Sequence, residues 1–396
     1  MNGNDIVIVS ATRTAIGKFG GQFATTSAIE LGTTVAKAAI QKANLSPEQI
    51  DTVIFGNVLQ AGLGQNPARQ VGLGAGLNHA STAVTVNEVC GSGLKAIISA
   101  AQAIRLGDAK IVLAGGMENM SLAPHLLQQR FAPKNGPVTL VDSLFNDGLT
   151  DVYSQDAMGI TAENIVEKYG FTREEQDAFA VASQQKAAKA QAEGRFASEI
   201  TPVAVFNRKT KSDDLKVTDE FIRPNTNVES LAGLKPSFKK DGTVTAGNAS
   251  GINDGAACVI MTTREYATEL GLPILATLKG YAEAGVDPSI MGIGPVPAIQ
   301  KLVARTRIPL EKVDVFELNE AFAAQSMAVI KDLNIPTEKV NPFGGAIALG
   351  HPIGASGTRI VVTLINALDQ LDGKIGVASL CVGGGMGVAI AIEREQ

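Results

Sequence analysis

An internal repeat constrains this chain more than any other feature of its 396 residues. Residues 92–95 (SGLK) and 356–359 (SGTR) each open an apolar helical run, and in both places a strand-like segment begins 19 residues after the serine. Upstream, residues 48–51 (EQID) and 311–314 (EKVD) each lead into a short β-branched run. The first pair is offset by 264 residues and the second by 263. Near-equal offsets at two separate places indicate an internal duplication.

Each half alternates short β-branched runs with helical periodicity. This pattern predicts an α/β layered domain with a mainly parallel sheet. The helix after Gly93 carries apolar residues at helical spacing, which predicts a stripe buried in the core. The residues of this stripe are Leu94, Ile97, Ile98, Ala101 and Ile104.

The segment between the halves differs in character. It contains a charged helical pattern from Thr172 to about Glu193 and a polar stretch over 207–220. Residues 208–240 hold eight Lys or Arg against five Asp or Glu, so this stretch is mildly basic within a chain of net charge −5. A solvated surface and a site for an anionic ligand both fit that charge. We expect an N-terminal half (1–121 with about 251–271), an inserted domain (122–250) and a C-terminal half (272–396).

Composition excludes several functions. The net charge of −5 argues against nucleic acid as a partner, because phosphate binding needs a basic surface. No apolar stretch approaches the roughly 20 residues that span a bilayer, and residues 1–9 lack the pattern of a signal peptide. Three cysteines are few and odd in number, which indicates a reducing compartment. We therefore expect a cytoplasmic protein without a membrane partner.

Cys90 is the first candidate for chemistry. It ends a strand-like run and precedes the apolar helix, within Val89-Cys90-Gly91-Ser92-Gly93. A thiol at a helix N-terminus faces unpaired N–H groups and the positive end of the helix dipole, which stabilise a thiolate. The alternative is a buried and inert cysteine. The position and the flanking glycines favour a nucleophile.

A glycine-rich loop follows the second candidate, Cys381. Four of the five residues 383–387 are glycine, so this segment cannot be a packed helix. Its backbone N–H groups could bind phosphate or form an oxyanion hole. The spacing does not match the dinucleotide-binding fingerprint.

His351 and Asn319 are two further candidates. Glycines and Pro352 frame His351 in a rigid turn, where a neutral imidazole could activate a thiol. His79 and His125 lack such framing, and the three histidines and three cysteines show no metal-ligand spacing. Asn319 lies between a strand-like run and an apolar helix, a position that local pattern interprets as a helix N-cap. It could also hold a catalytic water.

Together these segments resemble the active-site blocks of the thiolase family. The blocks are residues 89–93 (VCGSG), 319–322 (NEAF), 350–352 (GHP) and 381–385 (CVGGG), and the resemblance extends from the N-terminal strand to the C-terminus. It implies a five-layered, duplicated α/β/α/β/α core with an inserted loop domain. It closely matches the biosynthetic type, which condenses two acetyl-CoA molecules reversibly to acetoacetyl-CoA and CoA.

The resemblance also implies a role for each block. Cys90 is expected to be the nucleophile that carries the acyl group, and Cys381 the acid/base that removes a proton from the second acetyl-CoA. His351 is expected to activate Cys90 and to form one oxyanion hole with a water held by Asn319. The backbone N–H groups of Cys90 and Gly383 would form the other.

Coenzyme A contacts are implied in the same way. The pantetheine contact is expected at Ser250, and the nucleotide contacts at Arg223 and Ser230. The remaining expected contacts along the CoA tunnel are Met158, Phe238, Ala246, Ala321 and Phe322. One position departs from the family: short-chain biosynthetic thiolases usually carry a histidine before Met158, and this chain has Ala157. CoA thioesters are expected as substrates rather than cofactors, no metal is expected, and the family implies a homotetramer built as a dimer of dimers.

Three alternatives remain open. The first is a degradative 3-ketoacyl-CoA thiolase with the same catalytic residues and a longer acyl chain. The second is a decarboxylating condensing enzyme of the same fold, against which Cys381 argues, since those enzymes lack the second cysteine. The third is a non-catalytic acyl-CoA-binding protein that kept the fold.

Overall fold

The computed structural model describes residues 3–131 and 134–395. Its main sheet runs in the order β13-β14-β15-β12-β1-β11-β5-β3-β4, with short β2 (Gly17–Lys18) and β8 (Ile200–Thr201) added at β11 and β1. The sheet strands are β1 (Ile6–Thr14), β3 (Thr52–Gly56), β4 (Thr82–Val86), β5 (Val112–Asn119), β11 (Asn253–Thr263), β12 (Ala276–Gly285), β13 (Val315–Leu318), β14 (Ile375–Val382) and β15 (Met386–Arg394).

The two ends of this sheet repeat one topology. In the N-terminal part, β3 pairs parallel with β5, and β5, β11 and β1 then pair antiparallel. In the C-terminal part, β13 pairs parallel with β14, and β14, β15 and β12 then pair antiparallel. The halves join through a short antiparallel pairing of β1 with β12, at Val7–Thr277 and Ile8–Ala276. The segments that repeat in sequence thus form equivalent elements. The prediction of a mainly parallel sheet is wrong, because the central strands of the sheet pair antiparallel and the parallel pairs lie toward its ends.

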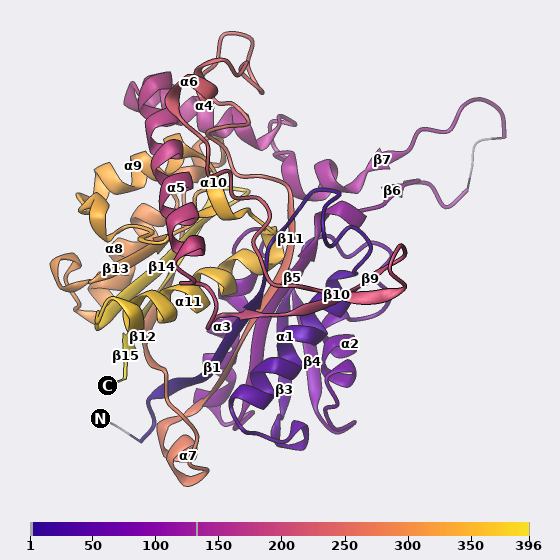
Figure 1. Cartoon of the computed structure of the whole chain (residues 1–396), viewed down its shortest axis with the longest axis vertical. Coiled ribbons are helices and arrows are strands. Elements are labelled where there is room, and N and C mark those ends of the chain that lie inside the picture. The colour runs from indigo at the N-terminus through magenta and orange to yellow at the C-terminus, as the bar shows by residue number, and fades with distance from the viewer. Residues whose placement is uncertain (1–2, 132–133, 396) are drawn as a thin grey trace.

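Helices separate and cover the two halves of the sheet (Figure 1). Helices α1 and α2 pack on the outer face of the N-terminal strands, α3 and α11 lie between the halves, and α8 covers the outer face of the C-terminal strands, with α9 beside it. The layers therefore run helix, sheet, helix, sheet, helix, as the resemblance implied. These helices are α1 (Ala28–Lys42), α2 (Pro67–Gly74), α3 (Ser92–Leu106), α8 (Pro295–Thr306), α9 (Ala323–Leu333) and α11 (Ile353–Gln370).

Strand alternation explains these layers. In β1, Ile6 and Ile8 belong to the central core that contains α3 and α11, whereas Val7 and Val9 belong to the core beneath α1. Successive side chains of a strand point to opposite faces, so a continuous apolar run is buried on both sides. The predicted stripe on α3 is confirmed, because Leu94, Ile97, Ile98, Ala101 and Ile104 all lie in the central core.

The region between β5 and β11 lies along one side of this core (Figure 1). The predicted charged helix is α5, and Thr172 caps it with a reciprocal bond to Glu175. Among the described residues no helix is long and apolar enough to cross a membrane. The elements of this region are β6 (His125–Leu126), β7 (Val141–Asp142), α4 (Met158–Tyr169), α5 (Arg173–Ala192), β8, β9 (Val203–Asn207), β10 (Ser212–Lys216) and α6 (Val228–Ala232).

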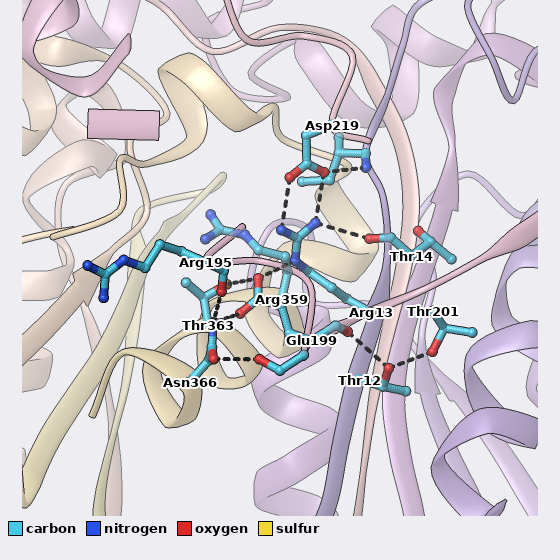
Figure 2. A network of polar contacts seen from close by, with 12 residues as sticks. Thr12, Arg13, Thr14, Arg195, Glu199, Thr201, Asp219, Arg359, Thr363 and Asn366 are labelled. Carbon is cyan, nitrogen blue, oxygen red and sulfur yellow. Dashed lines mark hydrogen bonds and ion pairs between the residues drawn. The ribbon is translucent and has the colours of Figure 1, made fainter. Parts of the chain in front are cut away.

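A buried ionic network fastens this region to the core (Figure 2). Arg13 of β1 donates to Glu199 at 2.5 Å and bonds Asp219 through both terminal nitrogens at 2.8 and 2.9 Å. Glu199 also accepts hydrogen bonds from Thr363 and Asn366 of α11. Removing one partner of a buried pair leaves an uncompensated charge and costs about 3–5 kcal/mol. The network thus fixes the course of the chain that leads to residues 219–223.

Candidate active site

A cavity of about 480 Å³ opens between the core and the inserted region. Its walls are mostly apolar, and Cys90, His351 and Gly383 lie on them. Seven of the predicted CoA contacts also line the cavity: Met158, Arg223, Phe238, Ala246, Ser250, Ala321 and Phe322. An apolar cavity with a few convergent polar groups is the usual form of a small-molecule site.

Cys90 lies in the connection between β4 and α3, two residues before the helix begins. Val89 precedes it with φ of 47°, which is rare for a β-branched residue. The backbone N–H groups of Gly383 and of Cys90 itself lower the pKa of the thiol, but burial outweighs them and raises the pKa to about 11. The prediction that the helix terminus keeps Cys90 as a thiolate is therefore wrong for the resting site. The thiol needs a base that removes its proton.

Cys381 is buried near the end of β14. Burial is the main cause that raises the pKa of its thiol, and the negative charge that Cys90 would carry raises it further. Cys381 belongs to the same apolar cluster as Phe322, which lines the cavity. The glycine loop after Cys381 is the tight turn between β14 and β15, where Gly384 and Gly385 have φ of 87° and 89°. This left-handed backbone favours glycine.

His351 lies in the turn between α10 (Ala346–Leu349) and α11. Burial, assisted by the positive charge of Arg359, lowers the pKa of its imidazole to about 3, so the ring is neutral at pH 7. Its Nδ1 is 2.6 Å from the hydroxyl oxygen of Ser356, and that hydroxyl donates to the carbonyl of Pro352 at 2.9 Å. Because the single hydroxyl proton is used, Ser356 accepts from Nδ1–H. The lone pair therefore remains on Nε2, which can accept a proton.

Asn319 follows β13 and is buried. Its side-chain nitrogen is 3.4 and 3.5 Å from the two ring nitrogens of His351. The residue that caps α9 is Phe322, so the interpretation of Asn319 as an N-cap is wrong. Asn319 and Cys381 thus lie directly behind the cavity wall, next to residues that form it.

Sequence reasoning missed three residues around this centre. Ser356 sets the tautomer of His351, and its only signal was a hydroxyl in the first turn after the His-Pro pair. Lys18 and Phe19 line the cavity from the N-terminal segment, 72 and 71 residues before Cys90, and no local pattern marks them.

Glu118 is a fourth missed residue, at the end of β5. It accepts hydrogen bonds from the side chain of Asn57 and from the backbone of Val58, Leu59 and Gly354. Burial raises the pKa of its carboxyl to about 7. Glu118 thereby joins the loop after β3 to the first turn of α11, beside His351.

The predicted CoA contacts are not all alike. Phe238 and Phe322 form an edge-to-face pair with ring centroids 6.2 Å apart, and the N–H of Ser250 donates to Ala321 at 2.9 Å. The guanidinium of Arg223 lies 5.0 Å above the ring of Phe221. Ser230 does not line the cavity; it belongs to the capping box of α6.

Ala157 also lines the cavity, immediately before α4. It occupies the N-cap position of that helix, and its methyl group makes no capping hydrogen bond. The departure from the family pattern thus lies on the cavity wall itself.

Similarity to known proteins extends over the whole chain. The model of the thiolase N-terminal domain matches residues 6–265, and that of the thiolase C-terminal domain matches residues 272–394. The acetyl-CoA acetyltransferase of Cupriavidus necator is 56% identical, covering 99% of this chain and 100% of the relative. A probable acetyl-CoA acyltransferase of Staphylococcus aureus is 55% identical over 99% of each chain.

Two solved structures are similar to this chain over its full length. The crystal structure of Bacillus anthracis acetyl-CoA acetyltransferase has a TM-score of 0.96 and 44% identity, with 99% of each chain covered. That of human mitochondrial 3-ketoacyl-CoA thiolase has a TM-score of 0.95 and 42% identity, with 100% of each covered. With both family models matched and identity above half over its full length, the chain belongs to the thiolase family.

Proposed function

We propose that this chain is an acetyl-CoA C-acetyltransferase, which condenses two acetyl-CoA molecules reversibly to acetoacetyl-CoA and CoA. One observation carries the proposal. A thiol on the cavity wall (Cys90), a neutral imidazole (His351) and a second buried thiol (Cys381) gather at a mostly apolar cavity of about 480 Å³. The names of the relatives from Cupriavidus necator and Bacillus anthracis support the same activity.

Acylation is the first step that these residues support. The Cys90 sulfur attacks the thioester carbonyl carbon of acetyl-CoA, and Nε2 of His351 takes the thiol proton. The oxyanion that forms is stabilised by the backbone N–H groups of Cys90 and Gly383, the same groups that lower the pKa of the Cys90 thiol. The bond from carbon to the CoA sulfur breaks, and that sulfur takes a proton from Cys381. An oxyanion-hole donor contributes about 3–4 kcal/mol in comparable sites.

Condensation is the second step, and it starts from the protonation states that exist after acylation. Cys381 is now a thiolate, and its raised pKa makes it a strong base for the methyl proton of the second acetyl-CoA. His351 and a water held by Asn319 stabilise the negative charge on that thioester oxygen. The carbanion attacks the acyl carbon on Cys90, the bond from carbon to Cys90 sulfur breaks, and His351 returns its proton to Cys90. Cys90, His351 and Cys381 are then in their starting protonation states, because the methyl proton has replaced the one that Cys381 gave to CoA.

The cavity walls suggest how CoA is held. We propose that the pantetheine arm lies along Ser250, Phe238 and Phe322, and that Arg223 attracts the phosphates near the nucleotide. Ser230, in the exposed cap of α6, would contribute only at the outer end. The insert over 122–250 would then carry most CoA contacts. These steps use side chains and backbone alone, so we propose no cofactor or metal.

Assembly and compartment are part of the same proposal. We propose a homotetramer in the cytoplasm. Exposed apolar side chains around the β6–β7 hairpin support assembly, since a free surface rarely carries so many. They are Leu127, Phe131, Val138 and Leu140, and Phe131 is 85% exposed. Light scattering of the purified chain would test the tetramer; a monomer at micromolar concentration would contradict it.

A degradative 3-ketoacyl-CoA thiolase for longer chains is the second candidate. Ala157 on the cavity wall leaves room that a histidine would fill, and the structure of human mitochondrial 3-ketoacyl-CoA thiolase is nearly as similar as that from Bacillus anthracis. The fold therefore does not separate these activities.

A chain-length profile of thiolysis separates the two candidates. We expect a higher kcat/KM with acetoacetyl-CoA than with a long-chain 3-ketoacyl-CoA. The Ala157→His variant should narrow the profile further toward acetoacetyl-CoA, because the ring occupies volume at the wall. A strong preference of the wild type for the long-chain substrate would contradict the acetyl-CoA C-acetyltransferase proposal. No turnover of either substrate would favour a non-catalytic acyl-CoA-binding protein.

A further inference from the structure

Arg359 is a buried arginine that the steps above do not use. It lies in the first half of α11, at the position that the 264-residue repeat matches with Lys95 of α3. Lys95 is partly exposed and pairs with Glu283 at 2.7 Å. Arg359 is instead only 2% exposed and points to groups at the end of β13. The same repeat position thus serves a different purpose in the second half.

Two contacts define the direction of its guanidinium. One terminal nitrogen is 3.4 Å from Oε2 of Glu317, and the other is 3.5 Å from the side-chain oxygen of Asn319. A guanidinium has only donors, so it meets the carbonyl end of the amide and not the NH₂ end. The NH₂ end of Asn319 then faces His351, at 3.4 and 3.5 Å from its ring nitrogens.

This pair is poorly built for stability. Both side chains are buried, yet in residues 3–131 and 134–395 neither Nε of Arg359 nor Oε1 of Glu317 has a hydrogen-bond partner. A buried ion pair that leaves polar atoms unsatisfied is at best neutral for folding. The network around Arg13 and Glu199 lies beside it (Figure 2), where the negative charge of Glu199 attracts the guanidinium and the positive charge of Arg13 repels it. A role in orienting the neighbouring Asn319 explains this ion pair better than a contribution to folding stability does.

The amide of Asn319 has two ends of nearly equal shape and opposite polarity. Flipped by half a turn, it would place its NH₂ against the guanidinium, where two donors repel. Its oxygen would then face His351, so the amide could no longer donate to the water that the proposed mechanism places there. We propose that Arg359, held by Glu317, is a positioning residue that keeps the NH₂ end of Asn319 turned toward His351. This inference rests on the proposed function of Asn319 in the oxyanion hole for enolate formation.

Two measured rates, acetylation of Cys90 and proton removal from acetyl-CoA, distinguish this positioning role from a purely structural one. Acetylation of Cys90 by acetyl-CoA is followed by rapid quench and intact-mass spectrometry. Proton removal is followed as loss of deuterium to water from acetyl-CoA labelled on its methyl group. Losing one oxyanion-hole donor costs roughly 100- to 1000-fold in rate. We expect Arg359→Met to slow deuterium loss on the order of 10- to 100-fold, below the cost of Asn319→Ala, while acetylation changes by less than about twofold.

The Arg359→Lys variant tests whether the effect of Arg359→Met comes only from misfolding. Lysine keeps the charge beside Glu317, but its single ammonium lacks the second arm that reaches Asn319, so the selective loss should persist in this variant. Arg13→Lys is the matched control, because Arg13 is equally buried in the adjoining network and does not contact Asn319. It should leave the ratio of the two rates unchanged.

A double-mutant cycle decides the matter. If Arg359 acts through Asn319, then Arg359→Met in an Asn319→Ala background slows deuterium loss by no more than about twofold further. The inference is overturned if the two effects multiply, if both rates fall alike, or if folded Arg359 variants keep normal deuterium loss while Asn319→Ala slows it. Normal deuterium loss in Asn319→Ala alone would instead overturn the proposed role of Asn319, and the inference with it.

Discussion

Replacing His351 by glutamine should change how the acetylation of Cys90 depends on pH. Burial raises the pKa of the Cys90 thiol to about 11, so the thiolate fraction at pH 7 is about one part in 10⁴. Burial also lowers the pKa of His351 to about 3, so the ring stays a neutral base across the neutral range. In the wild type both groups are in their reactive forms between pH 5 and 9, and the rate of acetylation should be nearly flat.

The variant lacks the base, so only the pre-existing thiolate reacts. General-base catalysis contributes roughly 100- to 10,000-fold, and we expect a loss of that order at pH 7. The residual rate should rise about tenfold for each pH unit from 7 to 10, following the thiolate fraction. Wild type and variant should therefore converge as the pH approaches the pKa of the thiol.

Rapid quench followed by intact-mass spectrometry measures the acetylation rate directly. His125→Gln is the matched control, because His125 is exposed on the β6–β7 hairpin. A wild-type rate that climbs tenfold per pH unit below pH 9 would refute the reasoning, since free thiolate would then be the reacting species. A flat profile in His351→Gln would refute it equally.

Substitutions at three further positions have definite expected outcomes. Ser356→Ala removes the partner that fixes the tautomer of His351 and should slow acetylation about 10- to 100-fold, as losses of such supporting partners do. Ser356→Thr keeps the hydroxyl and should retain most of the rate. Equal rates in the wild type and both variants would refute the tautomer argument. Cys381→Ala should leave acetylation of Cys90 detectable by mass spectrometry and abolish acetoacetyl-CoA formation, and retained condensation would exclude Cys381 as the base. Glu118→Gln presents an NH₂ group to N–H donors and should lower the free energy of unfolding by roughly 2–4 kcal/mol in urea titration; an unchanged midpoint would contradict its structural role.

The sequence predicted the architecture because its repeat is global. Matching offsets of 264 and 263 residues located equivalent helices and strands, and α3 and α11 do occupy one layer. Helix α5 was predicted from its charged helical pattern between Thr172 and about Glu193, which is a local signal. Such features depend on the chain within a few residues or on the comparison of one half with the other.

The electrostatics of the site could not be predicted in that way. The helix terminus next to Cys90 is visible in the sequence and favours a thiolate, but the burial that outweighs it comes from segments far along the chain. Asn319 was interpreted as a cap because its neighbours are a strand and a helix. Its actual partners, His351 and Arg359, lie 32 and 40 residues away. Their contacts require the packing of α11 on β13.

Peptide mapping of the wild-type protein after incubation with acetyl-CoA tests the central assignment most directly. We predict a single acetyl group on the peptide that contains Cys90, which free CoA removes and which Cys90→Ala lacks. An acetyl group on Cys381 or Cys258, or none at all on a folded protein, would contradict Cys90 as the nucleophile.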